Sequence, residues 1–337
     1  MIPLPPNLDD AAILAARGAR VPLDPSRPYR CLVEAEPLVR GGVADVATIF
    51  TTGAECPFRC LMCDLWKHTL ERSESVPGVA DQVERALQEL PDVPHLKIYN
   101  AGSFFDSQAV SAVDRERIAE LVQGRERVIV ECHPLLVDQR CAEFAAAIAP
   151  TVLEVAMGLE TIDPLVLSRL NKRMSLSDFD RAARLLRDSG VEIRAFILLG
   201  PPGHIGAMSV EWARRGVEHA LSLAASYAVV IPVRPGNGIL DQLERQGLFV
   251  RPTLAELTQV LTHGLESRGT SAAGRSDGCV LVDLWDIENS FDCPDCSPLR
   301  AEALRLMNLT QRPVAVIDCD CPNRADRFPR SGSSAPS

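Results

Sequence analysis

The chain has few aromatic residues and no long apolar run. Aromatic side chains make up 5% of its 337 residues. No uncharged apolar stretch approaches the roughly 18 residues needed to cross a bilayer. The first residues, MIPLPPNLDD, lack the basic leader and apolar core of a signal peptide. These absences predict a cytoplasmic protein that has no membrane partner.

Positive charge is also in deficit. The net charge is −10, which argues against broad, non-specific binding to a nucleic-acid backbone. A local basic patch is still compatible with this balance. Hydrophobic residues make up 46% and charged residues 24% of the chain, which is typical of a globular enzyme.

Cysteine, in contrast, is abundant. The chain has 11 cysteines, an odd number, and most of them lie in clusters. The cytoplasmic redox buffer keeps thiols reduced. Clustered cysteines in such a protein favour metal binding over a disulfide framework.

The order of apolar segments predicts an α/β fold. Residues 1–40 are rich in proline and arginine and are predicted to form an irregular N-terminal arm. From 41 to 268, short apolar runs alternate with amphipathic stretches, which is typical of a parallel sheet with crossover helices. Residues 269–329 form a small cysteine-rich appendage, and 330–337 a disordered tail. We therefore expect a partial (β/α)6 TIM-like barrel with a C-terminal appendage.

The predicted strands are Val46–Thr52, Leu96–Asn100, Val128–Cys132, Val152–Met157, Glu192–Leu199 and Tyr227–Ile231. The predicted helices lie near Val79–Leu90, Asp114–Gln123, Gln139–Ile148, Ser175–Ser189, Ser209–Leu223 and Thr253–Leu265.

The most informative motif is a loop of three cysteines, Cys56, Cys60 and Cys63, directly after the first predicted strand. In such barrels the chemistry lies at the C-terminal ends of the strands. Cysteine thiolates are the usual ligands of iron–sulfur clusters. Three of them can hold three irons of a four-iron cluster, and the fourth iron then keeps an open position for a substrate. The alternatives are a zinc site that lacks its fourth ligand and a chance grouping.

The C-x3-C-x2-C spacing, with Trp66 just beyond it, resembles the radical S-adenosylmethionine (SAM) superfamily. The resemblance implies a [4Fe-4S] cluster whose open iron is chelated by SAM. One-electron reduction, by a protein such as flavodoxin or ferredoxin, would then yield a 5′-deoxyadenosyl radical that removes a hydrogen atom from the substrate. In this chemistry the protein positions the cofactor and excludes side reactions.

The same resemblance indicates further site residues at the ends of the other predicted strands. Gly102 permits close approach of the backbone to a ligand, and Ser103 offers a hydroxyl group. Glu160 lies in a segment that resembles the superfamily's ribose- or methionine-binding segment, and Arg194 is a candidate partner for the methionine carboxylate. Glu131 and His133 are the candidate catalytic residues, since a histidine after a strand can act as an acid–base group. An ordinary turn or a bond to a neighbouring loop is the alternative for several of these positions.

A second set of cysteines lies in the appendage. Cys293 and Cys296 precede a predicted helix that runs to about Met307, and Cys319 and Cys321 follow it. Pairs with C-x2–4-C spacing are typical of structural zinc. The closer spacing of the second pair leaves an auxiliary iron–sulfur cluster as the alternative, and unligated thiols as a third.

The motifs together look like the archaeosine-type radical enzymes, which are related to the Elongator catalytic subunit and the methylthiotransferases. The resemblance covers roughly residues 45 to 321. It rests on Tyr99–Asp106, Val130–Pro134, Met157–Thr161 and Leu170–Met174, with the two cysteine segments. In that family a lysine-modified 7-deazaguanine in tRNA is cleaved to leave an amidine, and a separate partner installs the lysine. The resemblance thus implies tRNA and a partner subunit as binding partners.

Two other readings stay open. One is a radical SAM enzyme that acts on a small metabolite or a peptide. The other is a non-catalytic protein that binds zinc or an iron–sulfur cluster. The six β/α units argue against the second reading, because a binding module has no need of a barrel mouth.

Overall fold

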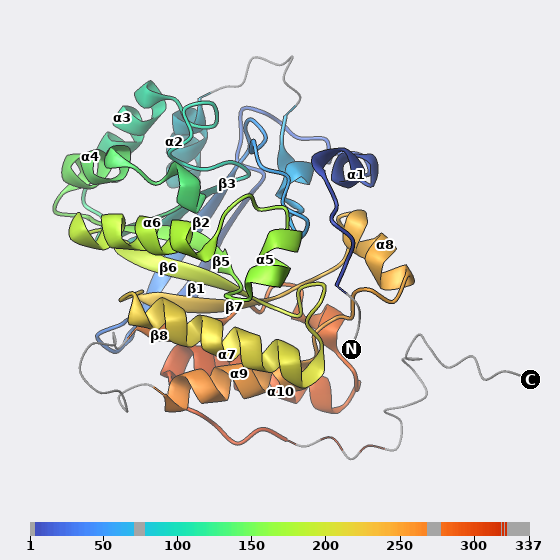
Figure 1. Cartoon of the computed structure of the whole chain (residues 1–337). Helices are drawn as coiled ribbons and strands as arrows, with labels where there is room; N and C mark the ends of the chain where they lie inside the picture. The colour runs from blue at the N-terminus through green and yellow to red at the C-terminus, as the bar shows by residue number, and fades with distance from the viewer. Residues whose placement is uncertain (1–3, 71–77, 268–277, 318, 320, 322–337) are drawn as a thin grey trace, which may run out of the picture.

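The computed structural model describes residues 4–70, 78–267 and 278–317, together with 319 and 321 (Figure 1). One eight-stranded sheet follows the chain order from β1 to β8. β1 pairs antiparallel with β2, and all the other neighbours are parallel. The strands are β1 (Arg30–Pro37), β2 (Val43–Thr51), β3 (His95–Asn100), β4 (Arg127–Glu131), β5 (Val152–Glu160), β6 (Glu192–Leu199), β7 (Tyr227–Pro232) and β8 (Cys279–Val282).

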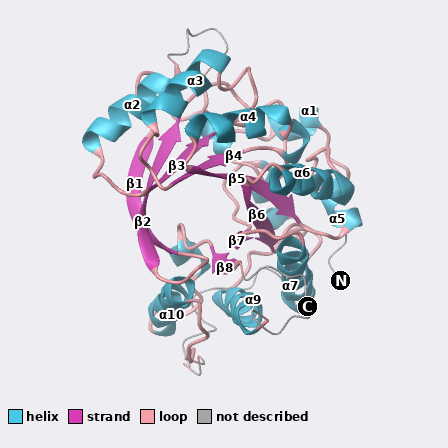
Figure 2. Cartoon of the chain, turned by 90° about the vertical axis from the view of Figure 1, so that its left-hand side faces the viewer, coloured by secondary structure: helices cyan, strands magenta, loops and turns pink. Residues whose placement is uncertain are grey.

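Helices cover the convex side of this sheet, which curves like part of a barrel wall (Figure 2). The predicted α/β partial barrel is confirmed, and the six predicted strands correspond to β2–β7. The helices are α1 (Asp10–Ala15), α2 (Val79–Glu89), α3 (Ala112–Leu121), α4 (Gln139–Ile148), α5 (Pro164–Arg169), α6 (Leu176–Asp188), α7 (Gly206–Ser222), α8 (Ile239–Arg245), α9 (Leu254–Glu266) and α10 (Cys296–Thr310). Short 3₁₀ helices are η1 (Leu65–His68), η2 (Pro134–Leu136) and η3 (Ile287–Ser290).

The main core lies between the sheet and its outer helices. In α2, for example, Val79, Val83 and Ala86 recur at helical spacing and are all buried. Local signals also fix the helix ends. Ser175 and Asp178 form the reciprocal capping box that starts α6. These elements therefore form where the sequence favours them, and the sheet face supplies the remaining stabilisation.

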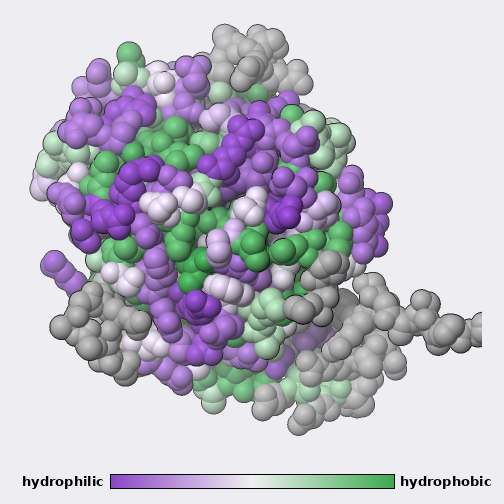
Figure 3. Space-filling view, in the orientation of Figure 1, coloured by the Kyte–Doolittle hydropathy of each residue, from purple (hydrophilic) through white to green (hydrophobic). Residues whose placement is uncertain are grey.

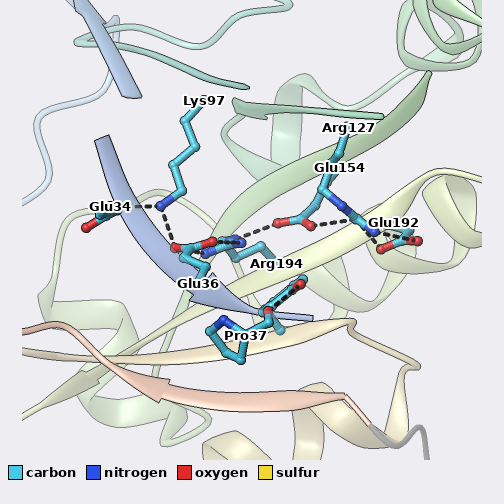
Figure 4. Close-up of polar contacts among 9 residues, drawn as sticks. Glu34, Glu36, Pro37, Lys97, Arg127, Glu154, Glu192 and Arg194 are labelled. Atoms are coloured by element: carbon cyan, nitrogen blue, oxygen red, sulfur yellow. Dashed lines mark hydrogen bonds and ion pairs between the residues drawn. The ribbon is translucent and has the colours of Figure 1, made fainter. Parts of the chain in front are cut away.

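Charged side chains fill the interior at the N-terminal ends of the strands (Figure 4). Arg194 donates to Glu154 at 2.5 Å and to Glu36 at 2.9 Å, with side-chain exposures of 3%, 0% and 13%. Arg127 bridges Glu154 and Glu192. We call this network the floor of the half-barrel. Because the floor occupies one end of the interior, the opposite end, where the strands finish, carries the loops of the site.

The structure differs from the prediction at both ends of the chain. The arm predicted as irregular contains α1 and the strand β1, which returns to β2 through a turn at Gly41 and Gly42 with positive φ values of 89° and 91°. β1 is an edge strand, and most of its residues are exposed, so its sequence lacks the apolar alternation that reveals a buried strand.

The predicted appendage is part of the barrel. β8 is the last strand of the sheet, and Ala301, Leu304 and Met307 of α10 belong to the same hydrophobic core as β2–β7. The predicted tail, residues 330–337, lies outside the described residues. Among the helices that the structure describes, none combines the length and the apolar composition that a bilayer crossing requires. Hydrophilic and hydrophobic side chains are interspersed over the face in Figure 3.

Candidate active site

The three-cysteine loop follows β2 at the C-terminal end of the half-barrel. The structure brings Cys56, Cys60 and Cys63 onto this one loop, each partly buried and free of any disulfide. Asn237, from the turn after β7, donates to the carbonyl of Leu61 at 2.7 Å and to that of Cys63 at 3.3 Å. The Leu61 N–H in turn donates to a carbonyl after α5, that of residue 170, at 2.8 Å. The backbone between the thiols is therefore fixed from two sides of the barrel.

Burial governs the protonation of these thiols in the metal-free chain. It raises the pKa of Cys60 to about 12, and the charge of Lys172 opposes that shift. Burial also raises the pKa of Cys56 and of Cys63. Since a thiolate is the metal ligand, binding of a metal group here must release protons.

The N-terminal segment covers the outside of the cysteine loop. Glu55 accepts from Arg17 at 2.6 Å and from Arg20 at 2.8 Å. The Arg17 guanidinium also lies over the Trp66 ring, 4.8 Å from its centroid. Ile13 of α1 packs in one hydrophobic cluster with Leu61. Residues 13–20, which belong to the arm predicted to be irregular, therefore form one wall of the site.

His133 connects three parts of the site. Its ring stacks on Phe58 of the cysteine loop, with centroids 3.7 Å apart and an interplanar angle of 11°. Its Nδ1 accepts from the N–H of Leu135 at 3.2 Å, so Nε2 carries the proton and donates to the carbonyl of Lys172 at 3.1 Å. Burial, aided by the charge of Lys172, lowers the pKa of His133 to about 3. Both ring nitrogens are thus engaged and the ring is neutral, which favours a positioning role over proton transfer.

Glu160 and Lys172 form a buried ion pair at the end of β5. Glu160 has a positive φ of 63° and lies at an irregularity in the pairing of β5 with β6. A Cβ atom on Gly158 would lie 1.9 Å from Glu160 Oε1 and 2.1 Å from Lys172 Nζ. A larger residue at 158 would displace the ends of both side chains. The pair lies close enough to the cysteine loop for Lys172 to act on the Cys60 thiol.

Gly102 and Ser103 lie after β3, as predicted. A Cβ on Gly102 would lie 2.7 Å from the Cβ of Ala109, so glycine there is explained by close packing of the chain on itself. The Ser103 hydroxyl accepts from the backbone N–H of His133 at 2.9 Å. It keeps its own proton available to donate.

Arg194 lies in the floor, whereas the cysteine loop follows the opposite ends of the strands. Its guanidinium is bound to Glu36 and Glu154 and lies over the Tyr227 ring, 4.3 Å from the centroid. This environment favours a structural role over the predicted contact with a cofactor carboxylate. The charges of Arg59, within the cysteine loop, and of Lys172 both act on the Cys56 thiol. Lys172 belongs to the segment Leu170–Met174, which also contributes to the family resemblance.

Glu131 ends β4 and points into the interior. Burial raises its pKa to about 8, and the charge of Lys172 opposes the shift. No hydrogen bond or ion pair of its carboxylate is formed with the described residues. Its neighbour in sheet register, Tyr99 of β3, likewise has a hydroxyl that bonds to none of them.

The second cysteine set also comes together as predicted. The Sγ atoms of Cys293, Cys296, Cys319 and Cys321 all lie within 4.8 Å of one another, and those of Cys296 and Cys321 are 3.4 Å apart. A single tetrahedral ion with bonds of about 2.3 Å places its thiolates at this separation. A cubane cluster carries its four thiolates on four different irons and so spreads them further apart. The spacing therefore fits one ion.

Asn237 and Phe58 are site residues that were not predicted from the sequence. Asn237 lay within a glycine-rich turn, Gly236-Asn237-Gly238, after a predicted strand. That position was a usable signal, since the ends of parallel strands meet at one edge of the sheet. Phe58 carried no signal beyond its place between two cysteines.

Several known proteins are similar to this chain. One relative, archaeosine synthase subunit beta from Methanosarcina acetivorans, is 26% identical over 301 residues, which cover 84% of this chain and 85% of that protein. A second protein of that name, from Thermococcus kodakarensis, is 23% identical over 210 residues, or 60% of this chain and 65% of its own length. Among solved structures, a queuine lyase from Clostridium spiroforme bound to SAM and queuine matches with a TM-score of 0.48 and 16% identity, over 66% of this chain and 90% of that one.

A family model matches the central part of the chain. Residues 50–206 match the model described as the radical SAM superfamily. These residues run from the end of β2 to the start of α7 and include the cysteine loop, His133 and the Glu160–Lys172 pair. The chain therefore carries a radical SAM domain over residues 50–206.

Proposed function

We propose that this enzyme holds a [4Fe-4S] cluster on Cys56, Cys60 and Cys63 and uses SAM to cleave a modified 7-deazaguanine in tRNA. The observation that carries the proposal is the set of three free thiols on one anchored loop at the strand ends. The donor set fits a four-iron cluster, because three thiolates leave one iron for SAM. When bound, this group supplies the one-electron cleavage of SAM and the removal of a hydrogen atom from the substrate.

The chain's own residues position that chemistry. Asn237 fixes the loop backbone, and His133 holds Phe58 and the Lys172 backbone in place. Gly102, Ser103 and the Glu160–Lys172 pair bind the polar parts of SAM. Lys172, with its positive charge, takes the role for which Arg194 was first considered.

Support for the substrate comes from the relatives. Two proteins at 26% and 23% identity are named archaeosine synthase subunit beta, and archaeosine is a 7-deazaguanine nucleoside. A subunit name implies a partner chain. With a net charge of −10, this chain contributes little to general RNA affinity, so the partner supplies most phosphate contacts. One electron for each SAM cleaved comes from a reductant protein such as flavodoxin or ferredoxin.

We also propose that Cys293, Cys296, Cys319 and Cys321 hold one structural zinc ion. The four Sγ atoms converge on a point, as a tetrahedral site requires. This zinc is separate from the cluster loop and closes the C-terminal part of the fold.

The cluster proposal is tested by anaerobic reconstitution of the full chain. The wild type should bind four irons at the loop and release 5′-deoxyadenosine when reduced with SAM present. Cys60→Ala should lose both properties. Cys31→Ser is the matched control, because Cys31 is exposed on β1 and belongs to neither cysteine set. Full 5′-deoxyadenosine release by Cys60→Ala would refute the assignment.

Salt dependence separates tRNA from a small metabolite or a peptide as the substrate. The enzyme with its partner subunit should be retained on immobilised tRNA with a steep loss of affinity as salt rises, because binding releases counterions. Retention that does not depend on salt would favour the small-substrate reading.

A further inference from the structure

The inner face of the half-barrel carries a continuous row of side chains just above the floor. The register pairs Arg30 with Phe50, and Phe50 with Tyr99. Tyr99 and Glu131 continue the register of β3 and β4 by one residue, and Glu131 is then paired with Ala156. Since alternate residues of a strand share one face, these side chains all point into the interior.

Electrostatics shows that the row faces one common space. Burial raises the pKa of Tyr29, and the charge of Glu131 adds to the shift. Burial also raises the pKa of Tyr99; the Arg194 charge opposes that shift and the Glu131 charge adds to it. Both phenols therefore feel the charge of the Glu131 carboxylate, in agreement with the strand register.

Aromatic rings build one wall of this space. The Phe50 ring lies 5.6 Å from Tyr29, 6.0 Å from Tyr99 and 6.2 Å from Trp285, all at tilted or edge-on angles. On the other side of Glu131 the row continues with Ala156, and Gly158 follows two residues later on β5. These two residues are small, and the charges of Lys172 and Glu160 both act on the Glu131 carboxyl group.

The floor and the row of side chains above it differ in whether their polar groups have hydrogen-bond or ion-pair partners. In the floor, each of Glu36, Glu154 and Glu192 pairs with a cation. In the row above it, the Glu131 carboxylate and the Tyr99 hydroxyl bond to none of the described residues. Both residues are half-buried, so these two groups are open to the interior of the half-barrel and free to bond to a ligand there.

We propose that Glu131, Tyr99 and Phe50 form a subsite for a planar heterocycle that presents two adjacent N–H donors, as a 7-deazaguanine does on its pyrimidine edge. The proposal deepens the proposed function, on which it rests. The carboxylate accepts from the two donors, as acidic side chains do from base amines, and the rings supply stacking surface. A site built to bond a donor discriminates strongly against an analogue that lacks it.

The test is equilibrium dialysis of the reconstituted full chain, with SAM present, at about pH 8.5, where a carboxyl group of pKa near 8 is mostly ionised. The probes are 7-deazaguanine and 7-deazahypoxanthine, which lacks the 2-amino donor. The wild type should bind 7-deazaguanine roughly 10-fold to 100-fold more tightly, the range expected for one good bidentate contact. Glu131→Gln should abolish the preference. Glu34→Gln is the matched control, since Glu34 pairs with Lys97 outside the subsite and should leave both affinities unchanged.

Equal binding of the two probes, binding of neither probe by the wild type, or an unchanged preference in Glu131→Gln would overturn the subsite. The proposed function is judged separately by 5′-deoxyadenosine release. If the wild type cleaves SAM but shows no preference between the probes, only the subsite proposal is contradicted. If the wild type fails to cleave SAM, the proposed function is contradicted.

Discussion

Phe58 and His133 stack with their ring centroids 3.7 Å apart, and this contact joins the cysteine loop to the end of β4. An aromatic stack contributes about 0.5–1.5 kcal/mol beyond its buried area. Phe58→Ala and His133→Ala should therefore both loosen the loop and lower the iron content after reconstitution.

His133→Asn tests the positioning role. With a pKa of about 3, His133 stays neutral throughout the range in which an ordinary histidine titrates. The pH profile of SAM cleavage by this variant should thus keep the wild-type shape at a lower amplitude. A wild-type ionisation near neutral pH that vanishes in the variant would assign proton transfer to His133.

Gly158→Ala should displace the ion pair beside the loop. The added Cβ would lie 1.9 Å from Glu160 Oε1 and 2.1 Å from Lys172 Nζ, so the ends of both side chains must shift. We expect at least tenfold weaker SAM binding by equilibrium dialysis of the reconstituted chain, a loss of about 1.4 kcal/mol. Gly18→Ala is the control, because a Cβ there meets no atom within 4 Å. Unchanged SAM affinity in Gly158→Ala would show that the Glu160–Lys172 pair does not contribute to SAM binding.

Arg194→Met should destabilise the fold without altering the cofactor site. The substitution leaves Glu36 and Glu154 without their shared cation, and breaking a buried pair costs about 3–5 kcal/mol. Denaturant unfolding should show this loss. The SAM affinity of the folded fraction should match that of the wild type. A selective loss of SAM affinity at unchanged stability would instead indicate that Arg194 contacts the cofactor.

Stability should depend on pH through Glu131. Its pKa rises from an ordinary value of 4.5 to about 8 in the folded chain, so folding favours the protonated carboxyl group. The free energy of unfolding should fall as pH rises through this interval. The charged groups that act on Glu131 are Lys172, Glu160 and Lys97. All three are present both in the wild type and in a Glu131→Gln variant.

Glu131→Gln removes the ionisation and therefore isolates this effect. The variant should match the wild type near pH 5 and melt at a higher temperature at pH 8.5. A gap that is largest at low pH would contradict the raised pKa.

The zinc proposal predicts one zinc per chain that survives loss of the cluster. Elemental analysis of Cys60→Ala should still find zinc, and X-ray absorption should show sulfur ligands at about 2.3 Å. Cys296→Ser should lose the metal and melt at a lower temperature, because binding of a structural ion contributes folding free energy. Iron in place of zinc, or no metal in the wild type, would contradict the assignment.

Much of this enzyme follows from local sequence patterns. The six inner strands are revealed by short apolar runs because both of their faces are covered, and the two cysteine sets are revealed by spacing. Neither β1 nor the partners of Arg194 could be predicted from such local patterns. An edge strand has weak alternation, and ion pairs such as Arg194–Glu36 join residues 158 positions apart. Spacing along the chain carries no trace of such contacts.

The half-barrel has a seam between the edge strands β1 and β8, where no ladder of backbone hydrogen bonds joins the wall in the described residues. It is bridged by the Tyr227 hydroxyl, which donates to the carbonyl of Pro37 at 3.0 Å, and by Arg30 over Trp285. α10 packs on both edges and begins at Cys296, one of the four convergent cysteines. A chain made during zinc starvation should therefore keep its cofactor side intact and lose closure at the seam, which would make the shape of the half-barrel depend on metal supply.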